Sequence, residues 1–287
     1  MKKNKNDNNT IGYIEGYYGK ILNWENRKRI INSLKKNNMN TYFYAPKEDV
    51  LNRLNWRIKY DLNWRKNFRD FTKYSNKNNV NVIAGIAPGL DFDFKEFNNK
   101  TKNKESADYT LLYNKSKQLL DDGANSIALL LDDIPEDFKN KFGNKVSEGT
   151  SHGVLANALS KSLGKSIYFV PRIYADELID SEPNYLKDLS LVLDSKIKVF
   201  YCGKNVVAKT LTNYSKIKRI LRNEIILWDN YYANDYCPRR FFVGPFIGRK
   251  KLNNIMINPT GLINTDLMIL DIVASNKSNN QFINEWK

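Results

Sequence analysis

The stretch Ile127-Ala128-Leu129-Leu130-Leu131-Asp132-Asp133 decides the fold, because five apolar residues lead without interruption into two neighbouring carboxylates. An unbroken apolar run of this length is typical of a strand buried on both faces, as in a parallel sheet covered by helices. The carboxyl ends of such strands are where α/β proteins place their active sites. Asp132 and Asp133 can therefore be catalytic, or they can form a turn in which one caps the next segment and the other faces water.

Short strands and amphipathic helices alternate on both sides of this run. Strands are predicted at 10–17, 40–46, 80–87, 126–132, 166–172, 197–202, 224–229 and 253–258. Helices are predicted at 24–38, 63–78, 106–121, 149–163, 183–194, 210–222 and 262–275. This alternation, in 287 residues without a linker rich in glycine, serine or proline, favours one α/β domain with the (β/α)8 TIM-barrel fold. A doubly wound open sheet is the alternative architecture.

We expect residues 1–9 to form a polar tail and residues 10–287 to form the barrel, with accessory domains absent. The tail is rich in asparagine and lysine and lacks the apolar segment of a secretion signal. No window approaches the roughly 18 apolar residues that cross a bilayer. Cys202 and Cys237 match neither a disulfide framework nor a zinc motif. These features predict a reduced, cytoplasmic protein that uses no metal, no cofactor and no membrane contact.

The net charge of +15, from 46 basic and 31 acidic residues, raises the question of a polyanionic partner. The basic residues are scattered, as Lys35-Lys36, Lys139 and Lys250-Lys251 show, over separate predicted helices and loops. Scattered charge is typical of a solvated surface. We therefore expect no nucleic-acid partner.

A barrel predicts that functional side chains gather directly after the strands. Polar residues do follow most of the predicted strands, at Glu15, Tyr18, Lys47, Asp49, Asp132, Asp133, Tyr174, Asn230, Asp235 and Asn258. Aromatic residues lie near the same strand ends, at Tyr17, Tyr18, Tyr44, Tyr201, Trp228, Tyr231 and Tyr232. This mixture suits a sugar, whose C–H face packs on an aromatic ring while its hydroxyls form hydrogen bonds.

Five motifs follow one another in the chain between about residues 12 and 260. They are Gly12-Tyr13-Ile14-Glu15-Gly16-Tyr17-Tyr18-Gly19, Asn40-Thr41-Tyr42-Phe43-Tyr44-Ala45-Pro46-Lys47-Glu48-Asp49, Leu131-Asp132-Asp133-Ile134, the segment 228–236 and the segment 242–249. Together they resemble glycoside hydrolase family 84, the family of O-GlcNAcases and bacterial N-acetylglucosaminidases. Matches in order over essentially the whole barrel are far more specific than one short motif.

The resemblance implies a β-N-acetylglucosaminidase that removes terminal β-linked GlcNAc from a glycan, glycopeptide or glycoprotein with retention. In this substrate-assisted chemistry, the sugar's own acetamide oxygen attacks the anomeric carbon and an oxazoline forms. The resemblance implies that Asp132 orients the acetamide and that Asp133 is the general acid/base. Both side chains reach one pocket only if the strand is already ending at Asp133, and the pKa values of two such close carboxyls should diverge.

The resemblance also implies the residues that bind the sugar. Its hydroxyls are expected to contact the Gly16 backbone, Lys47, Asn230, Asp235 and Asn258, with Asp235 on O4 and O6. Tyr174 is expected beside the acetamide and Trp228 in the pocket wall, and Tyr18 is expected to bind substrate as well. Arg172 and Ile173, just before Tyr174, depart from the family pattern. Cys202 is expected to be a packed thiol. His152, the only histidine, is expected to be structural.

The sequence leaves two other functions open. The first is a catalytically weak glycan-binding or scaffold barrel, against which the pair Asp132 and Asp133 argues, because binding alone needs no proton donor. The second is nucleic-acid binding through the net charge, against which the acidic, amide and aromatic rim argues. The sequence makes no prediction of an oligomer.

Overall fold

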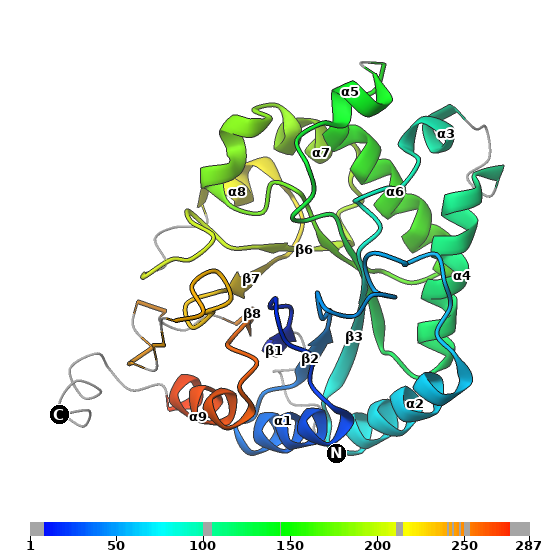
Figure 1. Cartoon of the computed structure of the whole chain (residues 1–287). Coiled ribbons are helices and arrows are strands. Elements are labelled where there is room, and N and C mark those ends of the chain that lie inside the picture. Colours follow the sequence, from blue (N-terminus) through cyan, green and yellow to red (C-terminus); the bar gives the residue numbers. More distant parts are fainter. Residues whose placement is uncertain are drawn as a thin grey trace, which may run out of the picture.

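The computed structural model describes residues 9–99, 105–143, 145–210, 215–239, 241–242, 244–246, 248–249 and 253–275. Within them, eight parallel strands close into a barrel in chain order (Figure 1). The strands are β1 (Ile11–Glu15), β2 (Thr41–Tyr44), β3 (Asn81–Ile86), β4 (Ser126–Leu130), β5 (Tyr168–Val170), β6 (Lys198–Tyr201), β7 (Ile225–Asp229) and β8 (Ile255–Ile257). The pairing of β8 with β1 closes the barrel, which confirms the TIM barrel and excludes the open sheet.

Helices form a ring around the strands (Figure 1). They are α1 (Trp24–Lys36), α2 (Leu62–Lys77), α3 (Phe94–Asn99), α4 (Ala107–Asp121), α5 (Phe138–Phe142), α6 (Glu148–Leu163), the 3₁₀ helix η2 (Asp176–Ser181), α7 (Tyr185–Val192), α8 (Ser215–Ile220) and α9 (Ile263–Ala274). None of the helices in the described part of the chain is long and apolar enough to cross a membrane.

The predicted strands and long helices are found close to their predicted positions, whereas three short helices were not predicted. The elements α3, α5 and η2 have five or six residues each, which is too short to show a helical period. The predicted helix at 210–222 is shorter in the structure, at Ser215–Ile220, and its residues 211–214 lie outside the described part. Residues 1–8 of the expected tail and residues 276–287 of the expected barrel domain also lie outside it.

Polar side chains fix where several of the long helices begin. The carboxylate of Asp61 accepts a hydrogen bond from the backbone N–H of Trp64 at the start of α2. The hydroxyl of Ser147 does the same for the N–H of Thr150 at the start of α6. Such caps satisfy N–H groups that have no partner inside the helix, so each strand-to-helix loop has a defined end.

The alternation of side chains along each strand separates two layers of core. Phe43 of β2 points into the barrel, where its ring stacks on Phe200 of β6 with the centroids 5.1 Å apart. Its neighbours Tyr42 and Tyr44 point outward and pack beneath the helices. This alternation is the period-2 geometry of a strand, and it decides which residue at each strand end can face the active site.

Glu15 and Asp49, both expected at the rim, lie in the wall of the barrel. Glu15 follows the inward-facing Ile14, so it points outward and accepts two hydrogen bonds of 2.8 Å from the buried Arg27. Asp49 accepts hydrogen bonds from the hydroxyls of Tyr44 and Tyr60, at 2.6 and 2.8 Å. Both carboxylates therefore hold the walls around the site and do not line it.

Candidate active site

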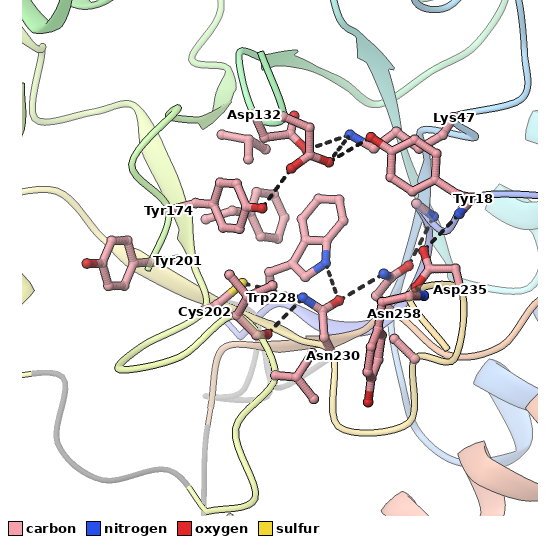
Figure 2. A pocket seen from close by; sticks show the side chains of 18 residues that line it. Tyr18, Lys47, Asp132, Tyr174, Tyr201, Cys202, Trp228, Asn230, Asp235 and Asn258 are labelled. Carbon is pink, nitrogen blue, oxygen red and sulfur yellow. Dashed lines mark hydrogen bonds and ion pairs between the residues drawn. The ribbon is translucent and has the colours of Figure 1, made fainter. Parts of the chain in front are cut away.

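A pocket of about 270 Å³ lies at the carboxyl ends of the strands (Figure 2). All the residues that the family resemblance implies for catalysis and sugar binding line this pocket, namely Gly16, Tyr18, Lys47, Asp132, Asp133, Tyr174, Trp228, Asn230, Asp235 and Asn258. These residues come from the loops after β1, β2, β4, β5, β7 and β8 and from β7 itself, so the barrel brings together side chains that are more than 200 positions apart in the sequence.

The backbone turns sharply at Asp133, and this turn lets both aspartates face one pocket. Strand β4 ends at Leu130, and Asp133 has a φ of 51°, in the left-handed region that L-residues seldom adopt. The ammonium Nζ of Lys47 lies 2.5 Å from Oδ2 of Asp132 and 3.4 Å from Oδ2 of Asp133. The requirement that the strand end before the second aspartate is therefore met.

Asp132 is the more deeply buried carboxyl of the pair. One oxygen accepts a hydrogen bond from Lys47, and the other has no hydrogen-bond partner among the described residues. A carboxylate can accept about four hydrogen bonds, so Asp132 keeps spare acceptor capacity. Burial raises the pKa of Asp132, and the neighbouring Asp133 raises it further against the opposing charge of Lys47.

Asp133 is partly exposed, and two tyrosine hydroxyls hold its carboxylate. Tyr174 donates to Oδ1 at 2.7 Å and Tyr18 donates to Oδ2 at 2.9 Å. Burial acts to raise the pKa of Asp133, but Lys47 and the two hydroxyls outweigh it and bring the pKa below its ordinary value. The two pKa values diverge, as the sequence predicts for adjacent carboxyls.

A chain of amide hydrogen bonds forms the opposite side of the pocket. The backbone N–H of Gly16 donates to Asn258, 3.2 Å away, and Asn258 donates to Oδ1 of Asn230 at 2.9 Å. The indole N–H of Trp228 donates to the same Asn230 oxygen at 2.9 Å. Figure 2 shows the Trp228 ring between these amides and the group around Asp132. Each amide is held in one orientation, which suits the directional recognition of hydroxyls.

Asp235 connects the loops after β1 and β7. Its Oδ2 accepts the backbone N–H of Tyr18 at 2.9 Å, and its Oδ1 accepts the N–H of Tyr236 at 3.0 Å. The carboxylate is therefore already oriented before any ligand arrives, while Asp235 still lines the pocket. The same contact fixes the backbone of Tyr18, whose side chain reaches Asp133.

Four of the aromatic residues expected at the rim lie elsewhere, while Tyr18, Tyr201 and Trp228 do line the pocket. Tyr17 is buried and bonds to the hydroxyl of Tyr13, 2.9 Å away. Tyr44 bonds to Asp49 in the wall. Tyr231 and Tyr232 donate to backbone carbonyls of the 244–246 segment and pack on Phe242. A position near a strand end gives proximity to the rim, but the direction of the side chain depends on the local turn.

Arg172 and Ile173, the positions that depart from the family pattern, point away from the pocket. Arg172 donates to Glu148 of α6 at 2.6 and 2.7 Å, and Ile173 is fully buried in the outer core. His152 of α6 bonds to the Tyr185 hydroxyl, 2.9 Å away, and burial together with Arg172 lowers its pKa to about 3. The histidine is structural, as the sequence predicts.

Cys202 lines the pocket as a packed thiol. Its sulfur accepts a hydrogen bond from Asn230 at 3.6 Å, and burial raises the pKa of the thiol well above its ordinary value. A thiol with a raised pKa is a poor nucleophile. The side chain therefore shapes the pocket together with apolar neighbours such as Val170, Phe200 and Val206, which the sequence reasoning did not select.

Arg53, which contacts the site from outside the pocket lining, is a further residue that the sequence-based prediction missed. It bonds to Tyr18 and to the backbone of Asp133 from the loop after β2. It lies nine residues beyond the end of that strand, so the strand period does not fix its direction. The loop has no regular spacing of apolar and polar residues, so the sequence does not predict the direction of a side chain this far from the strand.

Comparisons with known proteins agree with this fold. A family model described as beta-N-acetylglucosaminidase matches residues 11–275. Protein O-GlcNAcase of Rattus norvegicus is 28% identical over 261 residues, which cover 86% of this chain and 28% of the rat protein, and protein O-GlcNAcase of Mus musculus gives the same values. The chain thus spans less than a third of the length of these relatives.

Two solved structures of related sequence share the fold of this chain. The structure of CpGH84B superposes with a TM-score of 0.80 at 25% identity, covering 96% of this chain and 50% of that one. A mutant of the Thermobaculum terrenum O-GlcNAc hydrolase superposes with a TM-score of 0.81 at 25% identity, covering 94% of this chain and 60% of that one. With the family model matched from the first strand to the last helix, the chain belongs to the β-N-acetylglucosaminidase family, glycoside hydrolase family 84.

Proposed function

We propose that this barrel hydrolyses terminal β-linked GlcNAc from a glycan, glycopeptide or glycoprotein, with retention of the anomeric configuration. The observation that carries the proposal is the arrangement of Asp132 and Asp133, which share the ammonium of Lys47 inside one pocket. Two carboxyls of different proton affinity are what substrate-assisted glycoside hydrolysis needs. We place the reaction in the cytoplasm, which is supported by the free thiols of Cys202 and Cys237.

In the first step, the acetamide oxygen of the substrate forms a bond to the anomeric carbon while the bond to the leaving oxygen breaks. Asp132 accepts a hydrogen bond from the acetamide N–H and stabilises the positive charge that develops on the oxazoline. Its unused acceptor capacity supports this role. Asp133 gives its proton to the leaving oxygen. In the second step, Asp133 removes a proton from water, which attacks the anomeric carbon, opens the oxazoline and restores the acetamide.

The pKa shifts of the two aspartates support a role for the substrate in preparing this pair. The protein's own groups raise the pKa of Asp132 and lower that of Asp133, which is the reverse of what proton donation by Asp133 requires. A bound sugar covers Asp133 and desolvates it, which raises its pKa, while the acetamide N–H favours ionised Asp132. We propose that substrate binding reverses the order of the two pKa values, so that Asp133 holds the proton and Asp132 is ionised.

The remaining pocket residues bind the sugar in this proposal. Trp228 packs on the acetamide, with Tyr174 beside it. The hydroxyls bond to the Gly16 backbone, Lys47, Asn230, Asp235 and Asn258, and Asp235 takes O4 and O6. The fixed orientation of these amides and of the Asp235 carboxylate supports the assignment, because preorganised groups lose little entropy on binding.

Hydrolysis of an aryl β-N-acetylglucosaminide by the wild type is the decisive test. We expect turnover in which the first product, observed by NMR, is the β-anomer of GlcNAc. Asp133→Asn should lose about 10²–10⁴-fold in kcat/KM on a poor leaving group and much less on a good one. Asp121→Asn, at the exposed end of α4, is the matched control and should behave like wild type. GlcNAc binding without any turnover would instead favour the glycan-binding barrel.

A further inference from the structure

Arg53 contacts the site from outside the pocket lining. It is half-buried in the loop between β2 and α2. Its Nη1 donates to the hydroxyl oxygen of Tyr18 at 2.6 Å, and its Nη2 donates to the backbone carbonyl oxygen of Asp133 at 2.7 Å. One guanidinium therefore links the loop after β1 to the loop after β4.

The bond to Tyr18 decides which way the tyrosine proton points. An arginine has only donors, and a tyrosine hydroxyl has one proton to give. The Tyr18 oxygen must accept from Arg53, so its single proton is free for Oδ2 of Asp133, 2.9 Å away. The donors run in one direction, from Arg53 through Tyr18 to the Asp133 carboxylate.

The bond to the carbonyl acts on the backbone of the same residue. Asp133 has the left-handed φ of 51°, and such a conformation persists only where its surroundings hold it. The carbonyl that Arg53 holds belongs to this residue, so the guanidinium fixes the turn that directs the carboxylate into the pocket.

The loop that carries Arg53 is itself firmly held. The ammonium of Lys115 of α4 donates to the carbonyls of Leu51 and Ile58, on either side of the arginine. The side chain of Asn52 donates to the carbonyl of Gly85 at the end of β3, 2.8 Å away. Arg53 is thus presented from a rigid support, which residues that position a catalytic group require.

We propose that Arg53 is a positioning residue for Asp133, because its guanidinium fixes both the backbone turn of that residue and the hydroxyl that holds its carboxylate. The inference rests on the proposed role of Asp133 as acid/base. It adds a residue that touches no substrate but controls how readily the acid gives up its proton.

Several groups besides Arg53 face the Asp133 carboxylate. Lys47 comes from the loop after β2, Tyr18 from the loop after β1, Tyr174 from the loop after β5, the buried thiol of Cys202 from the loop after β6, and Asp132 precedes it. Lys47, both hydroxyls and Arg53 lower the pKa of Asp133. Loss of Arg53 removes one positive charge and frees the Tyr18 proton to point elsewhere, so the pKa of Asp133 should rise.

The test compares two aryl β-N-acetylglucosaminides, one with a good and one with a poor leaving group, for Arg53→Met and Arg53→Lys. Both variants should lose on the order of tenfold or more in kcat/KM on the poor leaving group, which needs the acid, and little on the good one. Lysine keeps the charge but cannot make both contacts, so it should not restore activity. Lys59→Ala, an exposed cation of the same loop, is the control.

A ratio of two substrates measured on one preparation is unaffected by the fraction of protein that is folded, so a folding defect cannot imitate the result. Equal loss on both substrates, or no loss, would overturn the inference. The acidic limb of the pH profile of kcat/KM, which reports the lowered pKa of Asp133 in the free protein, should also move up by roughly 0.5–1 pH unit in Arg53→Met. Tyr18→Phe should produce part of that shift, and the double variant should show less than the sum. An inactive wild type would refute the proposed function instead.

Discussion

The ammonium of Lys47 and the carboxylate of Asp132 form a 2.5 Å ion pair with both side chains buried. A buried pair of this kind is costly to break, because the remaining charge has no counter-ion. Here the cation also lies beside Asp133, so one lysine balances two carboxyls. The proton affinities of the pair therefore depend on a group that is neither acid nor base in the proposed reaction.

Replacement of Lys47 by methionine should move the whole pH profile of kcat/KM to higher pH. The pKa values of both aspartates rise when the cation is lost, so both limbs of the profile shift, by roughly one to two pH units. We expect activity at the optimum to fall by roughly a hundredfold, because the carboxyls also lose their common anchor. Lys66→Met, at an exposed position, is the control, and an unshifted profile would contradict the electrostatic argument.

Fluorination of the substrate's acetyl group tests whether the acetamide is the nucleophile. Each fluorine makes the carbonyl oxygen less nucleophilic, so kcat/KM should fall steeply from the unsubstituted to the trifluorinated substrate. Asp132→Asn should lose roughly 10²–10³-fold, as expected for removal of a group that stabilises charge in the transition state. A flat response to fluorination would remove the acetamide from the mechanism.

Gly16→Ala tests the close contact between the loop after β1 and Trp228. A Cβ atom at position 16 would lie 2.6 Å from the indole ring, so the ring or the loop must move. We expect the free energy of unfolding to fall by about 1–3 kcal/mol, with a raised KM, as for other overpacked sites. Gly19→Ala is the matched control. It meets no atom within 4 Å but has a φ of 77°, so it should strain the backbone and leave KM unchanged.

His152 should make the protein sensitive to acid. Its pKa is lowered to about 3 in the folded state by burial and by Arg172, against 6.5 for an unperturbed histidine. Between these values the unfolded chain binds more protons, so stability falls as pH decreases from about 6.5 towards 3, by up to about 5 kcal/mol. His152→Phe should remove this component of the pH dependence. Unfolding curves of both proteins from pH 7 to pH 4 should therefore converge or cross, and parallel curves would refute the assignment.

The barrel was predictable because its strands are apolar runs with polar ends, and the run 127–131 is the clearest of them. The direction of single side chains was less predictable. Glu15 is the last residue of β1 and Tyr18 lies in the loop after it, yet Glu15 faces Arg27 in the wall and Tyr18 faces the pocket. The alternation on β1 explains Glu15, since its neighbour Ile14 faces inward.

The aspartate pair shows where the sequence has too little information. The residue types indicated that both aspartates could share a pocket if the strand ended there, but the left-handed turn at Asp133 depends on contacts that long loops bring together. Arg53 was missed for the same reason. Its partners, Tyr18 and Asp133, are 35 and 80 positions away, and no local pattern records such pairs.

The hydrogen bond from the Gly16 backbone to Asn258 spans 242 positions of the chain. The pocket is therefore shared between the first and the last strand of the barrel, and half of its amide chain does not exist until β8 has docked beside β1. During synthesis, the aspartate pair leaves the ribosome before Asn258 does. Until Asn258 has emerged, the nascent chain has both aspartates but an incomplete sugar site. Glycosidase activity would thus report, in a single measurement, that the ring of strands has closed.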